Sequence, residues 1–82
     1  MKHVILYGTA ACHLCEEAEE LLIKAQQVIA FPIQIQKVDI SESDDLMSRY
    51  GIRIPVVFKK EAGAEINWPF DFNALVDFLV TG

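Results

Sequence analysis

The feature that most limits the fold is an apolar strand pattern that gives way, within a few residues, to a long amphipathic helix pattern. Val4–Tyr7 is a continuous β-branched, aliphatic and aromatic run ended by Gly8, as expected for a strand covered on both faces. From Cys12 to Ile29 apolar residues recur at spacings of three and four, and charged residues take the other side. Because a partly polar strand pattern follows at Ile33–Ile40, the chain is predicted to open with a β-α-β unit whose two strands are parallel.

The second half of the chain alternates turn residues with shorter apolar segments. The polar residues 41–43 are placed to cap a short helix, and we expect Gly51 to end that helix in a left-handed conformation. Pro55–Phe58 begins a third strand, and the alternating segment Glu65–Trp68 forms a fourth. Since Gly63 supplies a turn residue between them, these two strands are predicted to pair as an antiparallel hairpin.

The last segment has the clearest helical periodicity. Apolar residues in Phe72–Val80 follow the i, i+3, i+4, i+7 pattern, and Asp71 stands at the N-cap position. The predicted order is therefore β-α-β-α-β-β-α, an α/β fold with a four-stranded mixed sheet flanked by helices. We expect the first strand at the sheet centre and the second at an edge. With 82 residues and no repeat or linker tract, the prediction is a single domain over residues 1–82 and a monomer.

Composition excludes several classes of partner. The chain has 7 Lys and Arg against 12 Asp and Glu, so its net charge of -5 would repel a phosphate backbone or an anionic membrane surface. The apolar run near the N-terminus is shorter than the roughly 7 to 15 residues of a signal-peptide core, and no apolar run approaches the roughly 20 residues that span a bilayer. We therefore expect a cytoplasmic protein that binds neither nucleic acid nor membrane.

Two cysteines spaced C-x-x-C lie where the first strand pattern ends and the first helix pattern begins. Cys12 falls at the helix N-terminus, where free backbone N–H groups favour a thiolate, and Cys15 lies nearly one turn further along. In a reducing compartment such a pair is more plausibly catalytic, redox-sensing or metal-binding than a structural crosslink. We predict that Cys12 is the nucleophile, which attacks a disulfide to form a mixed disulfide, and that Cys15 resolves it.

The residues around the pair act on the pKa of Cys12 in opposite directions. The helix N-terminus and a protonated His13 would lower this pKa, whereas the carboxylates between Glu16 and Glu20 would raise it. His13 is therefore a candidate modulating residue. The alternative is that His13 is a solvent-exposed loop residue, and both interpretations stay open.

Four features together resemble the short, single-domain glutaredoxin-like proteins of the thioredoxin-fold superfamily. They are Cys12-x-x-Cys15 after the first strand, Ile54-Pro55-Val56 at the start of the third, the order of elements, and the spacing from Ile66 to Asp71-Phe72 before the last helix. A lone C-x-x-C is weak evidence, because zinc and haem motifs share it. The Ile-Pro-Val segment some forty residues downstream makes the resemblance more specific, and it covers nearly the whole chain.

The resemblance implies three substrate-binding residues. Pro55 would have a cis peptide bond and lie beside Cys12, and the Ile54 backbone would be offered to a bound peptide or to glutathione. Asp71 would hold the glutathione amino group. Residue by residue there are plainer alternatives, since Pro55 also suits the start of a strand in trans and Asp71 suits an N-cap.

The chain departs from the family pattern around the expected glutathione site. Histidine and leucine replace proline and tyrosine between the cysteines, and residues 7–11 lack the lysine that is typical shortly before them. Asn67 and Trp68 stand where two glycines are typical, which would narrow the approach of a tripeptide backbone. The segment Trp68-Pro69-Phe70 is either a partner-binding patch or part of the core, and its aromatic content favours the core.

The function predicted from these residues is thiol–disulfide oxidoreduction through Cys12 and Cys15, with no bound cofactor or metal. Its partners would be disulfide-containing proteins or small thiols, with glutathione, as a candidate co-substrate, or a reductase as electron donor. Two alternatives stay open: a binding module of the same fold without turnover, and a zinc or iron–sulfur protein using the cysteines with His13 or His3. A closed structural zinc site requires four ligands, and the absence of a second C-x-x-C from the sequence argues against the zinc alternative.

Overall fold

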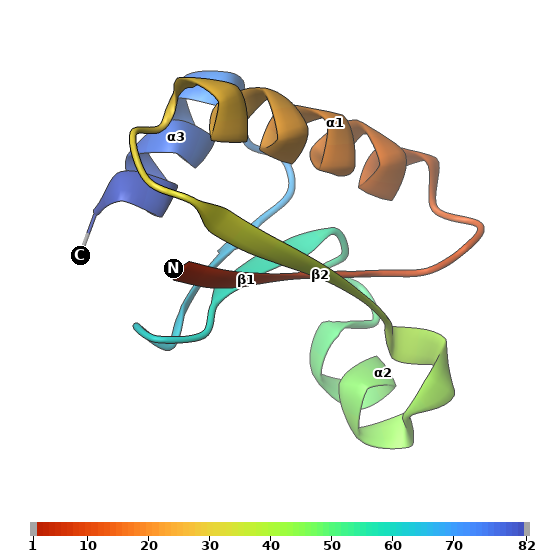
Figure 1. Ribbon diagram of the computed structural model, residues 1–82. Helices are drawn as coiled ribbons and strands as arrows, with labels where there is room; N and C mark the ends of the chain where they lie inside the picture. Colours follow the sequence, from red (N-terminus) through yellow and green to blue (C-terminus); the bar gives the residue numbers. More distant parts are fainter. Residues whose placement is uncertain (1, 82) are drawn as a thin grey trace.

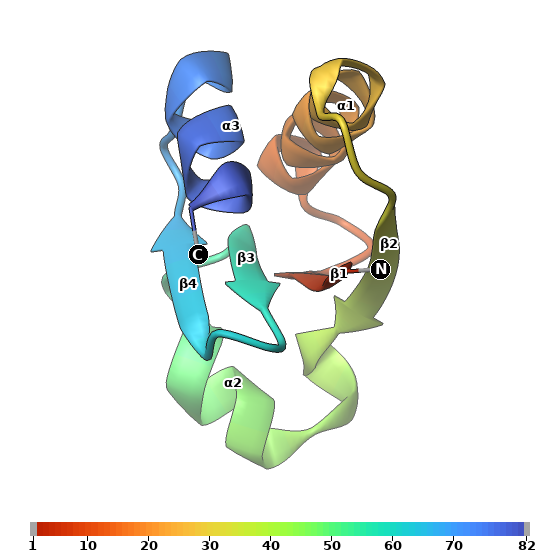
Figure 2. The ribbon, with the colours of Figure 1, turned by 60° about the vertical axis from the view of Figure 1, so that its left-hand side comes forward.

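The computed structural model, shown in Figure 1, describes residues 2–81. The elements within this range are β1 (Lys2–Gly8), α1 (His13–Val28), β2 (Ile33–Asp39), the 3-10 helix η1 (Ile40–Glu42), α2 (Asp44–Tyr50), β3 (Val56–Lys59), β4 (Ala64–Asn67) and α3 (Phe72–Val80). The strands form one sheet in the order β2-β1-β3-β4, so β1 lies in its interior (Figure 2). The predicted order of strands and α-helices is confirmed.

The pairing of the strands places the two halves of the chain on opposite sides of β1. β2 pairs with β1 in parallel, with Gly8 opposite Asp39. β3 pairs with the other side of β1 in the antiparallel sense, with Tyr7 opposite Val56, and β4 completes the hairpin. The central first strand, the parallel edge strand and the hairpin are therefore as predicted.

Helices α1 and α3 pack together on one face of the sheet, whereas α2 lies on the other side (Figure 2). The main core forms between the sheet and helices α1 and α3, because alternate residues of β1 and every third or fourth residue of α1 point into the same layer. Its buried members are Val4, Leu6, Ala18, Leu22, Ala25, Ile33, Val57, Phe70, Leu75 and Leu79. Full burial of one such aliphatic side chain contributes about 1.5–3 kcal/mol, so this layer fixes α1 on the sheet.

The opposite face of β1 is less covered than its apolar sequence predicts. Ile5 and Tyr7 are only half-buried, because α2 is short and covers one end of the sheet. Tyr7 stacks on Tyr50 of α2 with ring centroids 4.4 Å apart, beside the buried Ile40 and Val56. This second, smaller core sits under the end of the sheet from which the cysteine loop starts.

Two local details differ from the sequence predictions. Gly51 does not adopt a left-handed conformation, since its φ of -52° and ψ of -36° continue the right-handed helix. A glycine fits there because a Cβ would lie only 2.5 Å from the Met47 carbonyl oxygen. The turn glycine of the hairpin, Gly63, does have a positive φ of 68°. The 3-10 helix η1 was not predicted, and Ser43 rather than the whole polar cluster caps α2, by accepting a hydrogen bond from the Leu46 amide.

The aromatic segment between β4 and α3 belongs to the core. Phe70 is buried, and Trp68 is half-buried against it in an edge-to-face contact with ring centroids 5.1 Å apart. Both rings pack in the main core layer. The core interpretation of this segment therefore holds for both rings.

Candidate functional site

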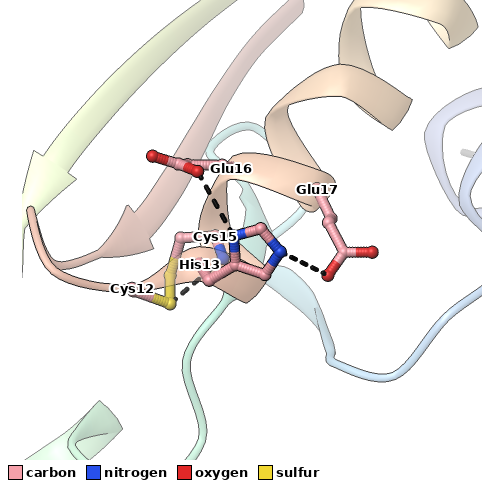
Figure 3. Close-up of a disulfide and its surroundings, with 5 residues drawn as sticks. All are labelled: Cys12, His13, Cys15, Glu16 and Glu17. Carbon is pink, nitrogen blue, oxygen red and sulfur yellow. Dashed lines mark hydrogen bonds and ion pairs between the residues drawn. A yellow bond between two sulfur atoms is a disulfide. The ribbon is translucent and has the colours of Figure 1, made fainter.

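The two cysteines lie where β1 passes into α1, and they form a disulfide (Figure 3). Their Cα atoms are 5.2 Å apart, which is within the usual range for a disulfide. Cys12 is the N-cap of α1: its backbone is extended, and its Sγ accepts a hydrogen bond of 3.0 Å from the Cys15 amide. That N–H is one of the free donors of the first helical turn, so after reduction it is placed to stabilise a thiolate on Cys12.

The two sulfur-bearing residues differ in exposure. Cys15 is buried, with 8% of its surface accessible, whereas Cys12 is half-buried. An incoming sulfur atom can therefore approach the residue at the N-cap more readily than the residue inside the helix. This asymmetry is what a nucleophile and a resolving thiol require.

Gly8, the last residue of β1, lies directly against the buried sulfur. A Cβ at this position would be 2.7 Å from Cys15 Sγ and 3.1 Å from Cys15 Cβ. Any side chain at position 8 would force Cys15 to move, so this disulfide geometry requires a glycine there. In the sequence Gly8 is recognisable only as the end of a strand, and its position directly before the cysteine loop was the available signal.

His13 is the first residue of α1 and is strongly exposed, with 83% of its side chain accessible. Its Nδ1 lies 3.5 Å from a Glu16 carboxylate oxygen and its Nε2 lies 3.9 Å from a Glu17 carboxylate oxygen (Figure 3). The positive charge of a protonated His13 would thus be partly balanced by its own helix. The structure places His13 next to the disulfide, at the surface.

Ile54 and Pro55 lie on the β3 side of the site. The Ile54–Pro55 peptide bond is cis, and Pro55 is buried immediately before β3. Since Tyr7 is opposite Val56, Pro55 comes level with Gly8 at the end of β1. The Pro55 carbonyl accepts a hydrogen bond of 3.0 Å from the Trp68 amide, which ties this segment to the end of β4.

Asp71 has a structural contact of its own. It is exposed and is the N-cap of α3, where its Oδ1 accepts a hydrogen bond of 2.7 Å from the Ala74 amide. This is the N-cap role that the sequence allowed.

A groove of about 440 Å³ opens beside the disulfide on the side opposite to Pro55. We call it the β2-side groove; its walls come from the end of β1, the start of α1, the end of β2 and η1, and both cysteines line it. Asp39 also lines it, and its carboxylate accepts hydrogen bonds from the hydroxyl and the amide of Ser41, at 2.7 and 2.9 Å. These two bonds, the hydroxyl first, hold the pKa of Asp39 below its ordinary value.

Within residues 2–81 there is neither a cluster of metal-binding side chains nor a helix that could span a membrane. Among residues 2–81, no three or more His, Cys, Asp and Glu side chains are grouped so that they could hold a metal ion. Within the same range, no helix combines the length and apolar character that crossing a membrane requires. In particular, His3 makes a different contact, because its Nδ1 lies 3.7 Å from a Glu61 carboxylate oxygen.

Comparison with protein families identifies the chain. A family model described as Glutaredoxin-like domain matches residues 3–80. The chain belongs to the glutaredoxin-like family. No match was found among curated proteins.

Solved structures agree with this assignment of the glutaredoxin-like chain. A structural-genomics target protein from X. campestris is 37% identical, with a TM-score of 0.79 and 93% of each chain covered. Protein Ne2328 from Nitrosomonas europaea is 26% identical, with a TM-score of 0.75, and the match covers 94% of this chain and 89% of that one. A thioredoxin-2 of the malaria parasite shares the fold at 17% identity, with a TM-score of 0.69 and coverage of 96% and 81%. The predicted thioredoxin-like fold of glutaredoxin type is confirmed.

Proposed function

We propose that this glutaredoxin-like protein is a thiol–disulfide oxidoreductase that uses Cys12 as nucleophile and Cys15 as resolving thiol. The observation that carries the proposal is the asymmetric cysteine pair: Cys12 is a half-buried residue at a helix N-cap, and it is bonded to Cys15, a buried residue nearly one turn further on. A fixed dithiol of this kind passes two electrons without any bound cofactor.

The proposed reaction has two exchange steps. The Cys12 thiolate attacks one sulfur of a substrate disulfide, a Cys12–substrate mixed disulfide forms, and the other substrate sulfur leaves as a thiolate that takes a proton from solvent. Cys15 then loses its proton to solvent and its thiolate attacks Cys12 Sγ. The second substrate thiolate leaves, and the Cys12–Cys15 disulfide remains. The substrate has gained two electrons, and an external thiol, such as glutathione or a reductase dithiol, returns the protein to the dithiol form.

The surroundings of the pair supply the proposed contacts to the substrate. Pro55 and the Ile54 backbone flank the end of β1, so an extended disulfide-bearing segment could lie along them as a short added strand. Asp71 is an exposed carboxylate, and we keep it as a candidate contact for the amino group of glutathione. His13, at the surface beside Cys12, would tune the thiolate through its charge. We further propose a monomer that acts in the cytoplasm.

The alternatives predict different chemistry. A redox-inactive binding module would have a Cys12 pKa near the free value of about 8.5 and would not accelerate disulfide exchange. A zinc or iron–sulfur protein would contain stoichiometric metal after purification. A closed zinc site usually needs four protein ligands. Residues 2–81 contain no group of three or more His, Cys, Asp and Glu side chains that could hold a metal ion, which favours neither a zinc site nor an iron–sulfur cluster held by one chain.

Substitution of each cysteine tests the proposal. We expect Cys12→Ser to abolish exchange with a model disulfide, and we expect Cys15→Ser to accumulate a mixed disulfide between Cys12 and the substrate, detected as added mass. Ala11→Ser is the matched control, because it adds a hydroxyl to the same loop and should leave exchange unchanged. Full activity in both cysteine variants would overturn the assignment.

A further inference from the structure

The β2-side groove carries a net negative charge that the proposed exchange reaction at the neighbouring disulfide does not use. Four of its lining side chains are carboxylates and one is an ammonium: Glu16, Glu19, Asp39, Glu42 and Lys37. The ammonium is already paired, because Lys37 Nζ lies 3.3 Å from a Glu19 carboxylate oxygen. The groove therefore keeps an excess of negative charge directly beside the two cysteines.

The remaining carboxylates are held by different elements. Glu16 is on the first turn of α1 and Glu42 is on η1, and both are exposed. Asp39 lies opposite Gly8 in the β1–β2 register, and its hydrogen bonds with Ser41 fix its carboxylate. Within residues 2–81, the only other titratable cation in contact with these groups is His13, which lies 3.5 Å from Glu16 and is charged only when protonated.

The position of the groove decides which part of a substrate could reach it. β2 and β3 lie on opposite sides of β1 (Figure 2). The groove is lined by the end of β2 and Pro55 directly precedes β3, so the two flank the disulfide on opposite sides. A protein segment that brings its own disulfide to Cys12 and runs along Ile54 would extend, on its other flank, over the groove. The substrate side chain next to the cysteine that Cys12 attacks would then lie in the groove.

We propose that the β2-side groove selects disulfide-bearing protein segments with a Lys or Arg side chain next to the reactive cysteine. This inference rests on the proposed function and adds the substrate class. Carboxylates placed around an open groove attract a cationic side chain and repel an anionic one, so they change the rate of encounter more than the final affinity. The rest of the lining is apolar or uncharged, as in Ala10 and Val38, and suits the aliphatic stem of a long basic side chain.

Matched peptide substrates test the inference. Three peptides carry the same cysteine, as a mixed disulfide with one neutral thiol, and differ only in Lys, Gln or Glu beside it. The second-order rate constant for reduction by the fully reduced protein is measured at low and at high salt. We expect the Lys peptide to react about ten times faster than the Glu peptide at low salt, and the ratio to shrink at high salt.

Paired variants separate the groove from the net charge of the protein. Glu16→Gln with Glu42→Gln removes two groove carboxylates, and Glu17→Gln with Glu20→Gln removes two carboxylates that do not line the groove. Each pair changes the net charge equally, and the ratio between peptides cancels any change in the thiolate itself. We expect the Lys-to-Glu ratio to fall to about two in the groove variant and to stay near ten in the control.

The outcomes distinguish this inference from the proposed function. Equal rates for the three peptides, or equal loss of the ratio in both paired variants, would overturn the selection of basic segments and leave the oxidoreductase intact. Failure to reduce any peptide would overturn the proposed function, and the inference with it.

Discussion

At the scale of single residues, the chemistry depends on what stands next to each sulfur. The sulfur of Cys12 accepts a hydrogen bond from the Cys15 amide. The sulfur of Cys15 packs against Gly8, where a side chain would not fit. The sequence was sufficient to predict that the two cysteines lie at the N-terminus of the first helix, because strand and helix patterns meet at this point. It was not sufficient for Gly8, because the contact between the end of a strand and the first turn of a helix depends on how the loop between them closes.

Gly8→Ala tests the contact with the buried sulfur. The added methyl group would lie 2.7 Å from Cys15 Sγ in the disulfide form, so we expect this substitution to destabilise the disulfide relative to the dithiol. Overpacking typically costs about 1–3 kcal/mol. If this cost falls on the disulfide form, the reduction potential of the two-electron couple becomes about 20–60 mV less negative. Equilibration with mixtures of reduced and oxidised glutathione measures the shift.

A second glycine provides the control for that experiment. Gly63→Ala places its methyl group in open space, at a positive φ of 68° far from the cysteines in sequence. It should lower the free energy of unfolding by about 1 kcal/mol and leave the potential unchanged. Equal potentials in the wild type and Gly8→Ala would show that the glycine does not position Cys15.

At the scale of elements, α3 has a side-chain contact at each of its ends. Asp71 caps its first turn, while at the other end Lys59 donates to the Phe78 and Thr81 carbonyls at 2.6 and 2.5 Å. Lys59 is buried, and burial lowers the pKa of its ammonium group. Both ends of this helix are thus fixed by side chains.

Asp71→Ala is predicted to lower the free energy of unfolding by about 0.5–2 kcal/mol, because the Ala74 amide loses its acceptor. Asp71→Ser keeps a capping oxygen and should restore most of that loss, as measured by urea denaturation. If Asp71 also binds the glutathione amino group, then Asp71→Ser would raise the KM for glutathione while stability is retained. Unchanged stability in Asp71→Ala would contradict the capping role.

The elements themselves were largely predictable, and their ends were less so. Periodicity in Phe72–Val80 gave the bounds of α3, because most of its apolar residues, with Leu75 and Leu79 at the centre, pack in one core layer. The short elements depend instead on contacts from elsewhere. η1 forms because the Asp39 carboxylate accepts from Ser41, and Gly51 stays right-handed beside the Met47 carbonyl. Neither contact leaves a periodic pattern in the sequence.

At the scale of the whole molecule, the order of the strands assembles the site. The central position of β1 brings the end of β2 to one side of the disulfide and Pro55 to the other. The family resemblance led us to expect Pro55 beside Cys12, and the register of β3 on β1 puts Pro55 level with Gly8. The β2-side groove could not be predicted, because it depends on the register that sets Asp39 opposite Gly8 and on η1 after it.

The central claim is that Cys12 and Cys15 form a reversible two-electron couple. The most direct measurement equilibrates the protein with a series of reduced and oxidised glutathione mixtures, quenches with acid, alkylates free thiols and weighs the products. The account predicts a single transition between dithiol and Cys12–Cys15 disulfide, with a potential of roughly -200 to -300 mV. Thiols that stay reduced across the whole series, or that carry glutathione without ever joining each other, would contradict it.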